Sequence, residues 1–163
     1  MSRKSDYTSD EWQLLLDVPP AVGTAVMYAG RSGAGSLKEA MALATGILGA
    51  RDGYEGNELV EALVAARIND GEKSPIETLD SPYRGLPPEE IASDAVAKCK
   101  SVIDVLNAKA SPSEAEGYIE WAVSLGEKVA RAAKEGGFLG IGGERVSEEE
   151  RRVLASVKKA LGV

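Results

Sequence analysis

The sequence predicts an all-α fold: an antiparallel bundle of about five to seven helices, or two packed helical hairpins. Several segments repeat apolar residues at spacings of three and four, which indicates amphipathic helices. Three segments begin with a hydroxyl residue three positions before a glutamate, the pattern of a capped helix. No segment alternates apolar and polar residues for long enough to form a convincing strand. We therefore expect one helical domain over residues 1–163, with halves at 8–68 and 89–161 and a long loop at 69–88.

The first helix is expected to begin at the capping box "TSDE", residues 8–11. Its apolar face is predicted to hold Trp12, Leu15 and Leu16. Pro19 and Pro20 are predicted to break or restart this helix, because proline cannot donate a backbone hydrogen bond to the preceding turn. A separate segment is then expected over 20–29, where Gly23 and several alanines would let another helix approach closely.

Two more helices are expected in the N-terminal half. The box "SLKE" at 36–39 predicts the start of one. Its core-facing stripe is predicted to hold Leu37, Ala40, Met41, Ala44, Ile47 and Leu48. Asn57 is expected to cap the next helix, over 58–68. The apolar face of that helix is predicted to hold Leu59, Leu63 and Ile68.

The C-terminal half follows a segment, 69–88, that is rich in Pro, Gly, Asp and Ser and has no period. Three helices are then expected. The first begins after Pro87 and Pro88 and is striped by Ile91, Ala95, Cys99, Val102 and Leu106. The second is entered through Pro112 and striped by Ile119, Ala122, Gly126, Val129 and Ala133. The third begins at the box "SEEE", 147–150, and carries Val153, Leu154, Val157 and Leu161.

The composition excludes several classes of function. The chain has no histidine and one cysteine, Cys99, so zinc, copper, haem and di-iron sites lack their usual ligands and Ser/His/Asp or Cys/His catalysis is absent. We expect no cofactor. A net charge of -7 argues against nucleic-acid binding. No run reaches the ~20 apolar residues of a membrane span. With no signal-peptide core and no possible internal disulfide, a cytoplasmic protein is predicted.

The stretch "GRSGAGSLK", residues 30–38, is a candidate for an anion site, because glycine-rich turns at helix starts offer backbone N–H groups. The residues that would serve it are Arg31, Ser32, Ser36 and Lys38. The stretch lacks the Gly-Lys-Ser/Thr ending and the preceding strand of a phosphate-binding loop. The pattern favours a helix end, a short turn and the start of the next helix.

A second glycine-rich stretch, "EGGFLGIGGERVSEEE" at 135–150, is crowded with carboxylates, which exclude a bound phosphate. Its apolar residues Phe138, Leu139 and Ile141 have two interpretations. They fold back and plug the end of the bundle, or they form an exposed tip that binds a partner or a second subunit.

An acidic turn, "RDGYEGNE" at 51–58, could hold a hard cation such as Ca²⁺ or Mg²⁺. The candidate ligands are Asp52, Glu55, Asn57 and Glu58. The spacing is not that of an EF-hand, and an ordinary turn explains the same residues.

Two segments, "DGYEGNELVEAL" at 52–63 and "GGERVSEEERRVL" at 142–154, resemble the TerB-like helical domains of tellurite resistance, in which an acidic helix start follows a glycine turn. The resemblance covers these two segments and assigns no residue a role. It implies a helical domain with a link to stress.

The sequence favours a non-enzymatic, cytoplasmic interaction or structural module that self-associates as a homo-oligomer, with a protein partner or itself as its ligand. The alternative is a domain that binds a small ligand or a divalent cation. An enzyme would need a pair of carboxylates in one pocket, one of them with a raised pKa.

Overall fold

The computed structural model describes residues 2–30, 37–69, 83, 85–134 and 146–163. These residues form seven α-helices and a short 3-10 helix and contain no strand, which confirms the predicted all-α bundle. The elements are η1 (Lys4–Asp6), α1 (Ser9–Ala29), α2 (Leu37–Leu48), α3 (Ala50–Gly53), α4 (Glu58–Asn69), α6 (Pro88–Lys109), α7 (Pro112–Lys134) and α8 (Glu148–Leu161).

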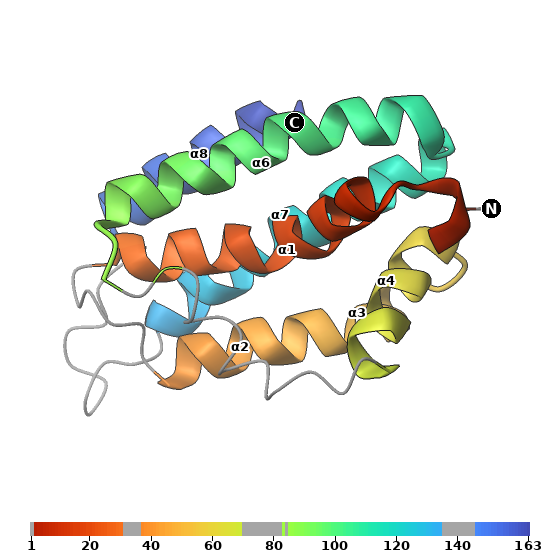
Figure 1. The fold of residues 1–163 in the computed structure, drawn as a ribbon. Helices are drawn as coiled ribbons and strands as arrows, with labels where there is room; N and C mark the ends of the chain where they lie inside the picture. Colours follow the sequence, from red (N-terminus) through yellow and green to blue (C-terminus); the bar gives the residue numbers. More distant parts are fainter. Residues whose placement is uncertain (1, 31–36, 70–82, 84, 135–145) are drawn as a thin grey trace.

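Helix α1 lies in the middle of the bundle (Figure 1). It packs against α6, α7, α8 and α2, while α2 and α4 also contact α7. The N-terminal part of the chain, up to α4, and the part from α6 onward share one core. Because α1 has neighbours on several sides, it is buried around most of its circumference, as expected for a central helix.

The predicted break at the two prolines was wrong: α1 continues through Pro19 and Pro20. Each proline leaves the carbonyl four residues earlier without its helical donor, which exposes the oxygens of Leu15 and Leu16 to other partners. Side chains from other helices replace the missing donors. The Tyr118 hydroxyl on α7 donates to the Leu15 carbonyl at 2.8 Å, and the Arg67 guanidinium on α4 donates to the Leu16 carbonyl. The carbonyls that the two prolines leave free therefore join three helices through one buried and one partly buried hydrogen bond.

Glycines sit where the helices cross most closely. The predicted close approach at Gly23 is confirmed, because a Cβ there would collide with Leu43 of α2. At Gly126 of α7, a Cβ would lie 2.7 Å from Leu154 of α8 and 3.1 Å from Val22 of α1. A methyl group at either crossing would therefore force a leucine side chain to move.

We expect Gly126→Ala to lower the free energy of unfolding by about 1–3 kcal/mol through overpacking, reduced by at most about 1 kcal/mol of gained helix propensity. Gly53→Ala in α3 is the matched control, since a Cβ at that position meets nothing within 4 Å. Urea unfolding of both variants tests this. Equal stabilities would show that the α7 crossing has room for a methyl group.

The predicted apolar faces are confirmed most fully in α6, where Ile91, Ala95, Cys99, Val102 and Leu106 are all buried. Two other assignments were wrong. Ile68 of α4 is exposed. In α2 the inward residues are Leu43 and Ile47, whereas Met41 and Leu48 face away from the core. Ser36, the capping residue of the expected box at 36–39, and most of the 69–88 loop lie outside the described residues.

Candidate functional site

The two glycine-rich candidate sites fall mainly in parts of the chain that the structure does not describe. Phe138, Leu139 and Ile141 lie outside the described residues, as do Arg31, Ser32 and Ser36. Lys38 is described and lies exposed near the start of α2. The tip and the anion site remain predictions.

The candidate cation ligands lie around α3 and the start of α4. Asp52 and Glu55 are exposed, and Glu58 is half-buried. Asn57 caps α4, since its Oδ1 accepts from the Val60 backbone N–H at 3.1 Å, and its Nδ2 donates to the Glu114 carbonyl at 3.1 Å. Within the described ranges, no group of three or more acidic or cysteine residues is placed to hold a metal ion. Cation binding here remains a prediction.

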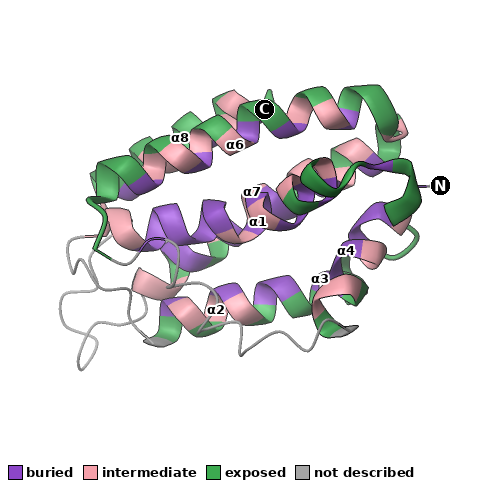
Figure 2. Cartoon of the chain, in the orientation of Figure 1, coloured by how far each residue is buried: buried purple, intermediate pink, exposed green. Residues whose placement is uncertain are grey.

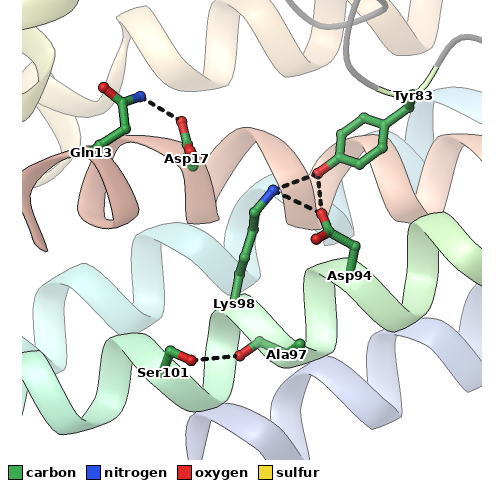
Figure 3. Close-up of polar contacts among 7 residues, drawn as sticks. All are labelled: Gln13, Asp17, Tyr83, Asp94, Ala97, Lys98 and Ser101. Atoms are coloured by element: carbon green, nitrogen blue, oxygen red, sulfur yellow. Dashed lines mark hydrogen bonds and ion pairs between the residues drawn. The ribbon is translucent and has the colours of Figure 1, made fainter. Parts of the chain in front are cut away.

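A polar cluster that the sequence reasoning missed joins Tyr83 to α6 (Figure 3). The Tyr83 hydroxyl donates to the Asp94 carboxylate at 2.8 Å. Lys98, one turn further along α6, donates to the same Asp94 oxygen at 2.7 Å and to the Tyr83 hydroxyl at 3.2 Å. The Tyr83 ring is buried against Ala21 and Ala25 of α1 and against α6.

The protonation states of this cluster suit a structural role, in which it holds Tyr83 against α6. Burial and donation to Asp94 raise the pKa of Tyr83 to about 12. Burial opposes ionisation of Asp94, but hydrogen bonds from Lys98 and Tyr83 outweigh it and lower the pKa of Asp94. Burial likewise opposes the charge on Lys98, and its bonds to Asp94 and Tyr83 still raise its pKa. At neutral pH the cluster therefore holds a phenol, a carboxylate and an ammonium group, and none of these is poised as a base or nucleophile.

A second polar cluster ties the N-terminus to the start of α7. The Glu114 carboxylate accepts from the backbone N–H and hydroxyl of Ser2, at 2.7 and 3.1 Å. It also accepts from the backbone N–H and hydroxyl of Ser111, at 2.9 and 2.7 Å. The Tyr7 hydroxyl donates to Ser2 at 3.0 Å. Burial alone would raise the pKa of Glu114, but these bonds lower it from 4.5 to about 2.

The outer side of α2 carries exposed apolar residues. Ala44 and Thr45 each lie three or four positions from Met41 and from Leu48, so the four residues form one stripe, here called the α2 stripe. Met41 is 52% exposed and Leu48 is 45% exposed. The opposite side of α2 is apolar as well, with Leu43 and Ile47 buried in the core. Apolar residues on two opposite sides of a helix are typical of a helix that packs against neighbours on both sides.

Figure 2 shows α2 at the edge of the bundle, with buried residues on one side and exposed residues on the other. Its charge is also distinct. The only carboxylate of α2, Glu39, is buried, whereas each other long helix of the described chain carries exposed or half-buried carboxylates. The α2 stripe itself carries no charged side chain, on a protein with a net charge of -7, and exposed Lys38 lies one turn before Met41 on the same side of the helix.

Some of these features left a signal in the sequence. Asp94 and Lys98 are four residues apart on one helix, the spacing of an ion pair. "SPSE" at 111–114 repeats the hydroxyl-to-glutamate spacing of a capping box, and that box is formed. Nothing in the sequence pairs Ser2 with Glu114, because 112 positions separate them.

No protein-family model matches this sequence, and no curated protein or solved structure shows significant similarity to it. The resemblance to TerB-like domains gains no support from these comparisons. Of the helices in the described part of the chain, none combines the length and the apolar composition that crossing a bilayer requires.

Proposed function

We propose that this protein is a non-enzymatic, cytoplasmic interaction module that self-associates, and that the α2 stripe is its contact surface. The observation that carries the proposal is the exposure of Met41 and Leu48 on a helix that is also apolar on its inner side. Exposed apolar residues on one side of a helix are characteristic of an interaction site, since burying them removes apolar area from water.

Charge supports the choice of this surface. The chain carries 26 acidic and 19 basic residues, so two copies repel each other over most orientations. In a contact through the α2 stripe, each copy presents α2, a helix on which no carboxylate is exposed. Because the attraction is apolar and the long-range repulsion is electrostatic, added salt should preserve or strengthen the association.

The stripe is small, and this sets the expected affinity. A helix of twelve residues is about 18 Å long, and a contact of that length lies at the low end of specific interfaces. We therefore expect a weak dimer whose population rises with concentration.

We expect Met41→Glu and Leu48→Glu each to weaken self-association by about tenfold or more, since every dimer then buries two carboxylates without partners. Both positions are exposed, so the monomer should keep its thermal stability to within about 0.5 kcal/mol. Ser101→Glu, on the exposed side of α6, is the control for added charge. Sedimentation velocity over a range of concentrations measures all three. If Ser101→Glu weakens self-association as much as the two stripe variants do, the effect comes from net charge and the stripe is not the contact surface.

A further inference from the structure

We propose that two copies of this chain pair through their α2 helices in antiparallel orientation, with Thr45 meeting its own counterpart across a two-fold axis. This inference rests on the proposed self-association and specifies its geometry. It follows from the order of side chains in the α2 stripe, from the bonding of Thr45 and from the direction of the helix.

The order of residues in the stripe is symmetric about its midpoint. Large side chains, Met41 and Leu48, stand at the two ends, and small ones, Ala44 and Thr45, stand between them. A two-fold interface requires a surface that is complementary to itself. In an antiparallel pair centred between residues 44 and 45, Met41 of each copy lies beside Leu48 of the other. The small residues at the centre let the two backbones approach to about 8 Å, the close end of helix packing.

Thr45 suits the centre of such a contact because its hydroxyl is already bonded. It donates to the Met41 carbonyl at 2.8 Å and also lies 3.2 Å from the Ala42 carbonyl. Burying Thr45 between two helices therefore leaves no polar atom without a partner, and its methyl group is free to make the contact.

The direction of the pairing follows from two considerations. Parallel α2 helices would place Met41 against Met41 and Leu48 against Leu48, with the helix dipoles aligned side by side. In the antiparallel arrangement the two helix dipoles point in opposite directions. At each end of the contact, the longer side chain of Met41 packs against the branched side chain of Leu48.

The test is site-specific cross-linking of the full chain. In a Thr45→Cys variant, the two-fold axis brings two thiols to a Cβ separation of about 4 Å, which a disulfide accepts. Ser101→Cys is the matched control: it is exposed, and its hydroxyl makes the same bond to the carbonyl four residues earlier, here that of Ala97. Native Cys99 can stay, since it is fully buried and burial raises its pKa to about 12.

Under mild oxidation we expect the Thr45→Cys variant to form a covalent dimer about tenfold faster than Ser101→Cys, because the pairing raises the effective concentration of its thiols. Adding Met41→Glu to Thr45→Cys should abolish this advantage. Equal rates for the two cysteine variants would overturn the pairing. Sedimentation of the unmodified chain then separates the two claims: a dimer without selective cross-linking refutes the geometry alone, and a monomer at all concentrations refutes self-association as well.

Discussion

Replacing Glu114 with glutamine is expected to lower the free energy of unfolding at neutral pH by up to about 3 kcal/mol. The reason is the shift in the pKa of Glu114 from 4.5 to about 2, which arises from hydrogen bonds that Ser111 and Ser2 donate to the carboxylate. Each pKa unit corresponds to about 1.4 kcal/mol of preference for the ionised form in the folded protein. A glutamine side chain keeps the shape but cannot accept four hydrogen bonds with the same charge.

The stabilisation by Glu114 should depend on pH in a definite direction. The pKa is lower in the folded state, so the stabilisation is fully present above about pH 5 and is lost as the pH falls toward about 2. Urea unfolding from pH 7 to pH 3 should therefore show the wild-type and Glu114→Gln stabilities converging in acid. Glu116→Gln, at an exposed position on the same helix, should follow the wild type. Parallel pH curves for Glu114→Gln and the wild type would contradict the assignment.

The second large effect is expected from Tyr118→Phe, at about 1–3 kcal/mol of lost stability. Tyr118 is fully buried, and its hydroxyl donates to the Leu15 carbonyl that Pro19 leaves without a helical donor. Phenylalanine fills the same space but leaves this carbonyl unsatisfied in the core. Tyr54→Phe is the control, since Tyr54 is half-buried and the loss of its hydroxyl should cost less than about 0.5 kcal/mol.

A double-mutant cycle separates this cause from a general loss of packing. Alanine at position 19 restores a backbone N–H that can donate to the Leu15 carbonyl. In the Pro19→Ala background, Tyr118→Phe should therefore cost at least about 1 kcal/mol less than in the wild type. Chemical denaturation of the four proteins gives the coupling energy. An unchanged cost in both backgrounds would show that Tyr118 does not substitute for the missing helical donor.

The sequence predicted the fold well where a helix has one apolar side. In α6 the apolar residues repeat along a single face and all five predicted core positions are buried. The capping boxes at Thr8 and Ser147 also formed as predicted, because these bonds are local and their spacing is fixed by the helix itself.

Periodicity failed where a helix is apolar all round. In α2 the spacing of apolar residues fits more than one face, so the predicted stripe held Met41 and Leu48, which are exposed, as well as Ile47, which is buried, and it missed the buried Leu43. Packing decides the rotation, since Gly46 lies against α7, where a Cβ would come within 2.5 Å of the Leu125 side chain. The surplus of apolar residues that caused this error is also the feature that marks the candidate interaction surface.

Long-range polar contacts were beyond sequence reasoning for a different reason. The proline pair was interpreted as a helix break, because the donors that rescue the two carbonyls come from Arg67 and Tyr118 on other helices. The bonds of Glu114 to Ser2 likewise depend on how the bundle closes. A single sequence specifies that such groups exist, while the tertiary arrangement specifies which of them meet.

If the chain associates with itself through the α2 stripe, sedimentation equilibrium of the unmodified protein should detect the dimer. Over loading concentrations from about 10 μM to about 500 μM, where a weak dimer is populated, the apparent mass should rise from 17.1 kDa toward twice that value. Met41→Glu should hold the mass at that of the monomer over the same range. A wild-type mass that stays at 17.1 kDa at every concentration and salt level would contradict the account.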